Sequence, residues 1–320
     1  MLQCVRFLFY LNVFCKISNA QVSQMYVGKV ENLNKVAKNV PLEEHSSPSL
    51  CHCTALCSSI CGCTCLGFNG QTKKCRLLKS CDTVDMTVTE YFWRYHILTL
   101  QDLPGDCKTL YDRGYRASAV YTIYPWERAS PVCRSIKVFC DMETNGGGWT
   151  AIQFRKTGSV NFTRNWADYK DGFGNPERDH WIGNDAIYQL TKDRPSLYVS
   201  LTRNNVNTKY ELYNQFSVSD ENDNYRLFLA GPATGTLGDN MLNTDRVIAG
   251  MGFTTLDRDN DNKGGGYNCA VAMAGGWWFN ACHRAFLNGP WASENWREPW
   301  SPGLMNGMDI IETKMMIKPR

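Results

Sequence analysis

The sequence predicts two folded parts in series, a small disulfide-rich part followed by a larger part that mixes strands with helices. Its 320 residues are about twice the length of an average domain. Eight cysteines lie between Cys51 and Cys81, whereas strand-like alternation of apolar residues appears only later in the chain. A turn-like segment, Leu-Pro-Gly-Asp at residues 103–106, separates the two regions. We therefore expect one domain over residues 21–100 and a second over residues 101–320.

The composition narrows the function classes. Apolar residues make up 43% of the chain and charged residues 20%, as in ordinary globular proteins. With 34 basic and 31 acidic side chains and no basic block, we expect neither nucleic acid nor a charged membrane surface as a partner. Gly-x-Ser-x-Gly, His-Glu-x-x-His and phosphate-loop motifs are absent, so we do not expect an enzyme.

Residues 1–20 are predicted to be a signal peptide. Arg6 precedes an apolar run at residues 7–15, and Ser18-Asn19-Ala20 offers small residues for cleavage before Gln21. The run is about half the length that a membrane span needs, and no later segment is long enough. The alternative is a buried N-terminal strand. A secreted, extracellular protein is expected, with a glycan on Asn161 of the sequon at residues 161–163.

Disulfides are expected to staple the smaller domain, because some 80 residues make only a small core. Zinc bound by cysteines and His52 is the alternative. Cys53-x3-Cys57, the run from Cys65 to Phe68 and Cys75-Arg-Leu resemble a PAN/apple domain. That resemblance implies a module for binding and self-association, with a disulfide-stapled spacer as the alternative. Additional cysteines leave the pairing open.

The larger domain shows a series of strand patterns. Residues 136–143 and 149–155 alternate in polarity, and Asn-Gly-Gly-Gly at 145–148 suits the tight connection between them. Further strands are expected at 196–203, 209–215 and 225–230. A helix is expected from Asn184 as its N-cap, with Ile187 and Leu190 facing the core.

These segments occur in a fixed order with Trp- and Gly-rich motifs between them, and the whole series closely resembles the fibrinogen C-terminal domain family. The resemblance runs from about residue 106 to residue 320 and ends in a strand at 311–319. It implies an α+β fold with a central twisted, mostly antiparallel sheet and a loop-rich subdomain for calcium and ligand. It also implies the disulfides Cys107–Cys140 and Cys269–Cys282. Cys133 is left over, either for a bond outside this domain or as a buried thiol.

A calcium site is expected in the segment 257–266, which has carboxylates at alternating positions before three glycines. Ca²⁺ prefers several oxygen ligands, partly from backbone carbonyls. The family resemblance assigns the side chains of Asp259 and Asp261 and the carbonyl oxygens of Lys263 and Gly265. It assigns Asp257 no direct bond to the Ca²⁺ ion. The alternative is a solvated acidic turn.

The segment 269–289 resembles the ligand pocket of the lectin members of the family, of the ficolin and tachylectin type. Such a pocket holds an acetyl group between aromatic walls, beside a cis peptide, here Ala281–Cys282. In this sequence a methionine stands where the family has one aromatic wall, and a tryptophan after the segment is a candidate replacement, although the late tryptophans can equally be core. The candidate ligand-binding residues are Met273, Asn280, Ala281, His283 and Trp291.

The resulting expectation is a calcium-dependent, lectin-like recognition protein of innate immunity. It would bind glycans or acetylated groups on cell surfaces. Homo-oligomerisation through the apple-like domain or Cys133 would add avidity. The first alternative is a protein-binding ligand or matrix factor, like angiopoietin or tenascin relatives, which uses the same face for a protein receptor. The second is a toxin-like or coagulation-type polymerising module.

Overall fold

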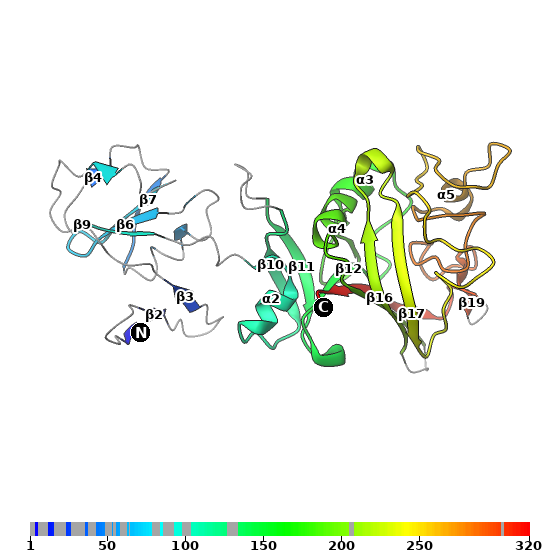
Figure 1. Cartoon of the computed structure of the whole chain (residues 1–320), viewed down its shortest axis with the longest axis horizontal. Helices are drawn as coiled ribbons and strands as arrows, with labels where there is room; N and C mark the ends of the chain where they lie inside the picture. The colour runs from blue at the N-terminus through cyan, green and yellow to red at the C-terminus, as the bar shows by residue number, and fades with distance from the viewer. Residues whose placement is uncertain are drawn as a thin grey trace. The chain divides into compact units, whose positions relative to one another are not determined.

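The computed structural model divides the chain into two compact units (Figure 1). The first comprises Met1–Pro104 with Trp126–Ser135, and the second Gly105–Pro125 with Ile136–Arg320. No helix in the described part of the chain has the length and apolar character to cross a membrane. The structure describes residues 4–5, 12–15, 24–26, 36–37, 43–48, 53, 56–57, 63, 65–78, 84–85, 93–97, 104–126, 134–204, 208–301 and 304–320.

The first unit contains a four-stranded antiparallel sheet with strand order β5-β7-β6-β9. Disulfides join Cys53 to Cys75 and Cys57 to Cys63, which settles two pairings that the sequence left open. Their sulfurs pack with Leu66 in the core of this unit. His52 lies outside the described residues, as does most of the predicted signal peptide, whose cleavage stays a prediction. The strands of this unit are β1 (Cys4–Val5), β2 (Asn12–Cys15), β3 (Gln24–Tyr26), β4 (Val36–Ala37), β5 (Glu43–Ser46), β6 (Cys65–Asn69), β7 (Lys74–Leu78), β8 (Val84–Asp85) and β9 (Trp93–Ile97).

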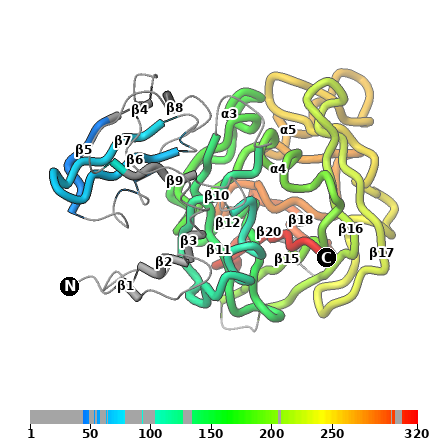
Figure 2. Tube along the Cα trace, turned by 60° about the vertical axis from the view of Figure 1, so that its left-hand side comes forward, coloured from blue at the N-terminus to red at the C-terminus, as the bar shows by residue number. Residues whose placement is uncertain are grey.

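The second unit is built on an antiparallel sheet with strand order β10-β11-β12-β20-β15-β16-β17. The last strand of the chain, β20, lies between β12 and β15 in the middle of this sheet (Figure 2). The short strand β14 pairs with β12 and with β13. The mixed α+β class and the mostly antiparallel sheet are confirmed. The strands are β10 (Ala119–Ile123), β11 (Ile136–Asp141), β12 (Trp149–Arg155), β13 (Phe173–Gly174), β14 (His180–Trp181), β15 (Ser196–Arg203), β16 (Lys209–Val218), β17 (Leu227–Gly235), β18 (Arg297–Trp300), β19 (Leu304–Asn306) and β20 (Ile310–Lys318).

Short helices flank the sheet, and α4 packs against β16. In the loop-rich part that follows β17, the helix α5 carries one side of the candidate site. The described helices of this unit are α2 (Cys107–Asp112), α3 (Trp166–Asp171), α4 (Asn184–Leu190) and α5 (Cys269–Met273), with 3-10 turns at Thr144–Gly146 and Glu221–Asp223.

The strands β12 and β15 begin and end where the sequence predicts, and the predicted turn between β11 and β12 has Asn145 at φ 43°. The expectation that Asn184 caps α4 is wrong, because Gly183 is the N-cap. The side-chain oxygen of the buried Asn184 instead accepts a hydrogen bond from the indole of Trp181 at 3.1 Å. Ile187 is buried as expected, whereas Leu190 is only half-buried. A tertiary contact thus overrides a local capping preference.

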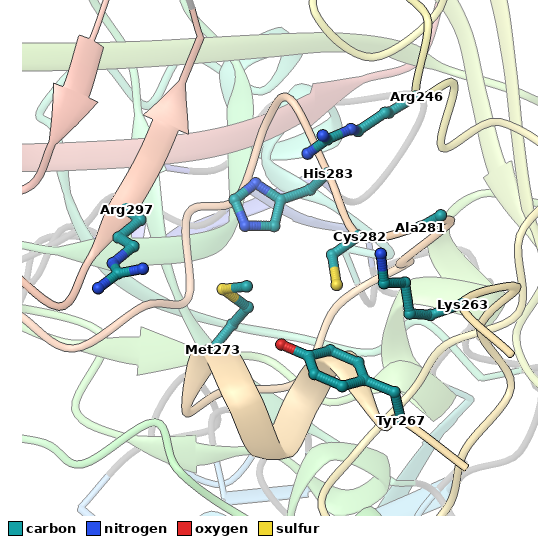
Figure 3. Close-up of a pocket in the computed structure, with 8 residues that line it drawn as sticks. All are labelled: Arg246, Lys263, Tyr267, Met273, Ala281, Cys282, His283 and Arg297. Atoms are coloured by element: carbon teal, nitrogen blue, oxygen red, sulfur yellow. The ribbon is translucent and has the colours of Figure 1, made fainter. Parts of the chain in front are cut away.

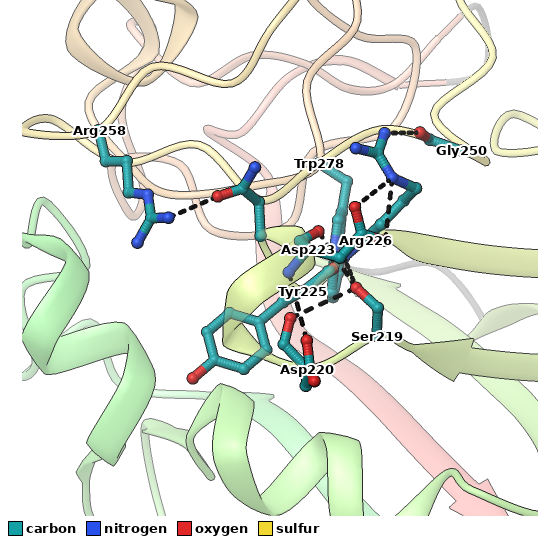
Figure 4. A network of polar contacts seen from close by, with 9 residues as sticks. Ser219, Asp220, Asp223, Tyr225, Arg226, Gly250, Arg258 and Trp278 are labelled. Carbon is teal, nitrogen blue, oxygen red and sulfur yellow. Dashed lines mark hydrogen bonds and ion pairs between the residues drawn. The ribbon is translucent and has the colours of Figure 1, made fainter.

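The hairpin turn between β16 and β17 anchors the loop-rich part to the sheet (Figure 4). Arg226 bonds the carboxylate of Asp223 at 3.0 Å and the carbonyl oxygen of Gly250 at 2.7 Å. Arg258, in the expected calcium loop, donates to the side-chain oxygen of Asn224 at 2.6 Å. Two arginines therefore connect this one turn to two segments of the loop-rich part.

An aromatic core packs around residues 276–278, which lie between α5 and Ala281. Trp278 packs against Phe253 at a ring-centroid distance of 5.1 Å and against Trp181 at 6.0 Å. The hydroxyl of Tyr169 donates to the carbonyl oxygen of Phe162 and accepts from the amide of Gly276. All four rings are buried, so these contacts hold the backbone at residues 276–278 in place.

Polar side chains of β12 hold the backbone at residues 287–289, which follow this segment in the chain. Gln153 donates to the carbonyl oxygen of Leu287 at 3.1 Å. Arg155, which is 1% exposed, donates to the carbonyl oxygens of Leu287 and Gly289. Its guanidinium also lies over the ring of Phe162, 4.2 Å from the centroid. Burial lowers the pKa of Arg155 to about 10, so the group stays charged at neutral pH.

Candidate functional site

A pocket of about 340 Å³ opens in the loop-rich part of the second unit (Figure 3). Its walls come from segments far apart in the sequence: the loop before Ile248, the expected calcium loop, α5, the segment after Asn280, and β18. The side chains in Figure 3 converge on a common space. The lining residues are Arg246, Lys263, Tyr267, Met273, Ala281, Cys282, His283 and Arg297.

A disulfide fixes the floor of this pocket. Cys269, the first residue of α5, is bonded to Cys282, and the Cys107–Cys140 bond is also present, as the resemblance implies. The peptide between Ala281 and Cys282 is cis, which the resemblance also implies. Asn268 is the N-cap of α5, and its side chain accepts from two amides of the first turn.

Three of the candidate ligand-binding residues, Met273, Ala281 and His283, line the pocket. His283 is 2% exposed, and its ring packs against Phe279 and Phe286 at 5.7 and 5.1 Å between centroids. In Figure 3 the side chain of Met273 lies below the ring of His283. The lining therefore contains the thioether that the sequence predicts in place of the aromatic wall of the lectin members.

The other two candidates, Asn280 and Trp291, are not among the lining residues. The amide of Asn280 donates to the carbonyl oxygen of Val247 at 2.9 Å, and its oxygen lies 3.2 Å from the amide of Asn262. Asn280 therefore ties neighbouring loops together behind the pocket. Trp291 packs against Trp296, with ring centroids 5.9 Å apart.

Sequence reasoning missed the cations of the pocket. Arg246 and Arg297 line it, and so does the side chain of Lys263, which was considered only for its carbonyl oxygen. The loop that carries Arg246 is held by the neighbouring Asp245, which forms two hydrogen bonds with Arg284, each 2.8 Å long. No local pattern in the sequence announces this cluster, because its members lie on three separate segments.

The expected calcium loop brings two carboxylates together. Asp261 accepts from the amides of Lys263 and Cys269, both at 2.7 Å, and Asp259 accepts from the amide of Asp261 at 3.1 Å. Burial and the adjacent carboxylate of Asp259 both raise the pKa of Asp261. Asp257 is used elsewhere, since it accepts from the backbone amide of Trp166 at 2.8 Å.

The carboxylate oxygens of Asp259 and Asp261 suit Ca²⁺. Two neighbouring carboxylates repel each other, and a hard cation between them removes that cost. Among the described residues no group of three or more His, Cys, Asp or Glu side chains could hold a metal ion, so further protein ligands would be backbone oxygens or uncharged side-chain oxygens. Gly264 and Gly265 have φ of 61° and 70°, which leaves the backbone free to turn carbonyls inward. Bound Ca²⁺ would supply charge neutralisation and fix the loop that carries Lys263.

We expect Ca²⁺ to stabilise the second unit. Millimolar Ca²⁺ should raise its thermal midpoint by several degrees over the EDTA-treated chain, because the ion binds only the folded loop. Asp259→Asn and Asp261→Asn should each remove most of that shift in differential scanning fluorimetry. Asp193→Asn, at an exposed carboxylate, is the matched control. Equal shifts in all variants would contradict the assignment.

The side chain of Asn161 is exposed, and its oxygen accepts from the amide of Thr163 at 2.9 Å. Asn161 is in the only Asn-x-Ser/Thr sequon of the sequence. We therefore expect one N-linked glycan when the chain is secreted from an animal cell line. Peptide-N-glycosidase should convert the wild type to the mobility of untreated Asn161→Gln. A wild-type band that this enzyme does not shift would refute the prediction.

The sequence profile of the family described as fibrinogen beta and gamma chains, C-terminal globular domain, matches residues 103–320. The chain belongs to this family. Its fibrinogen-type domain is 39% identical to human angiopoietin-1 over 225 residues, which covers 67% of this chain and 42% of that relative. The chain thus spans less than half the length of the angiopoietin-1 that it matches.

Solved structures show the same likeness. The fibrinogen-like globe domain of human ANGPTL2 superposes with a TM-score of 0.60 at 33% identity, which covers 68% of this chain and 99% of that one. The lamprey fibrin D-dimer, complexed with the peptide Gly-His-Arg-Pro-amide, superposes with a TM-score of 0.58 at 32% identity. The match covers 68% of this chain and 73% of that one. This fibrinogen-type protein is extracellular, a compartment in which disulfides such as Cys107–Cys140 persist.

Proposed function

We propose that this protein is an extracellular ligand that binds a protein receptor through the loop-rich face of its fibrinogen-type domain. The observation that carries the proposal is an exposed apolar margin beside the pocket. Tyr267 is 44% exposed and Val271, on α5, is 56% exposed. Aromatic side chains such as tyrosine are enriched at protein-binding surfaces. The similarity to angiopoietin-1 and to the ANGPTL2 globe domain supports the same direction.

This proposal reverses the order of the two functions expected from the sequence. The lectin reading depended on an acetyl pocket with aromatic walls, in which Trp291 was the candidate replacement for the wall that Met273 does not provide. Trp291 is not among the lining residues, and Tyr267 is the aromatic residue that lines the pocket beside His283. The named relatives do not support a lectin of the ficolin or tachylectin type. Binding of glycans or acetylated groups, and a role in innate immunity, therefore become the alternative that the experiment below must exclude.

The proposed role is binding and not catalysis. The neighbour of the pocket histidine, Cys282, is bonded to Cys269, so its sulfur is not a nucleophile. For the first unit we propose an apple-like module that holds copies of the chain together, supported by its small disulfide-bonded sheet. Cys133, which lies outside the described residues, is the alternative link.

The test uses the full secreted chain, fluorescently labelled, on cultured animal cells in Ca²⁺-containing buffer. Saturable binding should disappear after mild trypsin treatment of the cells. It should survive glycosidase treatment and an excess of free N-acetylglucosamine. Binding that resists trypsin but is lost with N-acetylglucosamine would replace the proposal with the lectin reading. Absence of saturable binding to a broad panel of cell lines would refute it.

A further inference from the structure

We propose that the pocket binds an acidic side chain of a protein partner, so that a carboxylate is the anchor of recognition. This inference rests on the proposed function and names the chemistry of the partner. It follows from the charge of the lining: Arg246, Lys263 and Arg297 reach the same cavity from three different segments (Figure 3). No carboxylate is among the lining residues.

The nearby carboxylates are occupied by other contacts. Asp245 is engaged in its two-point contact with Arg284, and Asp261 accepts from two backbone amides. Among the residues that the structure describes, no acidic side chain forms an ion pair with Lys263 or Arg297. Both of these side chains are exposed. An incoming anion would therefore find cations that the domain itself does not neutralise, which favours entry of negative charge.

The remaining surface favours a peptide over a sulfated glycan. Met273 and the exposed Tyr267 line the pocket, and the exposed Val271 precedes Met273 by two residues on α5. Tyr267 is the one exposed aromatic ring of the lining, whereas the thioether of Met273 and the side chain of Val271 pack against aliphatic side chains. A short segment with an acidic residue flanked by apolar ones matches both the cations and this margin.

The same charges disfavour a basic peptide. The ligand of the lamprey relative, Gly-His-Arg-Pro-amide, has an arginine and a free amino terminus and no carboxylate, so it is cationic. In this chain a ligand of that charge would meet Arg246, Lys263 and Arg297 and be repelled. The pocket is therefore expected to select the opposite charge.

The test selects a phage-displayed random dodecapeptide library on the full chain at about 0.15 M salt with Ca²⁺ present. Selected clones should be strongly enriched in Asp and Glu next to apolar residues. Their binding should weaken at higher salt, because exposed charge pairs are screened. An acidic content no higher than in the unselected library, or no enrichment at all, would overturn the proposal.

Variants assign the selected peptides to the pocket. Arg297→Glu and Lys263→Glu should each weaken their binding by about tenfold, and Arg297→Lys should retain most of it. Lys209→Glu reverses an exposed charge on β16, outside the pocket, and should bind as the wild type does. Acidic peptides that bind all variants equally would overturn the assignment. Selective binding of heparin oligosaccharides without acidic peptide enrichment would assign the cations to a glycan instead.

The two proposals fail separately. If trypsin-sensitive cell binding persists in Arg297→Glu and Lys263→Glu, the receptor function stands and the acidic anchor is wrong. If the wild type shows no trypsin-sensitive cell binding but selects acidic peptides through the pocket, the anchor stands and the receptor function is wrong. Circular dichroism of each variant verifies that the fold is retained.

Discussion

Replacing Asp179 by alanine should lower the free energy of unfolding of the fibrinogen-type domain by about 3–5 kcal/mol. The carboxylate is fully buried, directly before β14. It accepts from the amides of Lys156 and Thr157 at 2.8 and 3.0 Å, and from the amide of Ser159. Hydroxyls of Thr157 and Ser159 donate to it as well. Alanine would leave this set of buried donors without an acceptor.

Urea titration followed by tryptophan fluorescence, with disulfides intact, measures this change. Asp193→Ala, at an exposed carboxylate in the same domain, should stay within about 0.5 kcal/mol of the wild type. A loss below about 1 kcal/mol for Asp179→Ala would show that water or a shifted loop can replace the carboxylate.

The same carboxylate predicts a pH dependence. Burial alone would raise the pKa of Asp179, but the hydrogen bonds from Thr157, Lys156 and Ser159 outweigh it and hold the pKa well below the usual value. The stabilisation is complete above the unfolded pKa of about 3.9 and is lost as the pH falls below it. The stability difference between wild type and Asp179→Asn should therefore shrink from pH 5 to pH 2. A difference that is constant over this range would contradict the assignment.

Trp296→Ala should lower the free energy of unfolding of the domain by about 3–5 kcal/mol, which corresponds to a fall of about 10 °C in its thermal midpoint. The indole is fully buried and donates to the carbonyl oxygen of Phe286 at 2.8 Å. A Cβ built on Gly289 or on Gly307 would lie 2.1 or 2.4 Å from its ring atoms, so the ring is packed directly against backbone on both sides. The variant loses this packing and a hydrogen bond together.

Trp291→Ala is the matched control, because the same residue type stands five positions earlier at a half-buried site. Its thermal midpoint should fall by less than half as much in scanning calorimetry. Gly289→Ala, which adds one methyl group against the ring of Trp296, should be destabilising as well. Equal losses for the two tryptophan variants would mean that Trp291 also belongs to the core.

These tryptophans show where prediction from sequence stops. The late Trp-rich segment allowed either a ligand wall or a core, and the choice depends on glycines on either side of Trp296. Local patterns sufficed for β12 and β15, whose bounds the sequence predicts, because alternation and turn residues act over a few positions. Asn184 shows the limit of such rules, since its amide serves Trp181 and not the helix end.

The candidate site was predictable only where its residues lie in one sequence motif of the family. His283 and the Cys269–Cys282 bond come from one continuous segment that the resemblance covers. Arg246 lies in a loop and Arg297 is the first residue of β18, some fifty residues later in the chain. The contact between Asp245 and Arg284 holds the loop of Arg246, and no local pattern in the sequence brings the two arginines together. The charge of the pocket, and hence the kind of partner proposed, is therefore a property of the tertiary structure.

The central position of β20 has a consequence for biosynthesis. Every other strand of the sheet precedes Ile310–Lys318 in the chain, yet β12 and β15 meet only through this strand. During translation the two halves of the sheet cannot join until β20 has left the ribosome, and each half has an unpaired edge strand until then. A premature stop that removes β20 would therefore leave the nascent chain divided and aggregation-prone, and quality control in the endoplasmic reticulum would retain it.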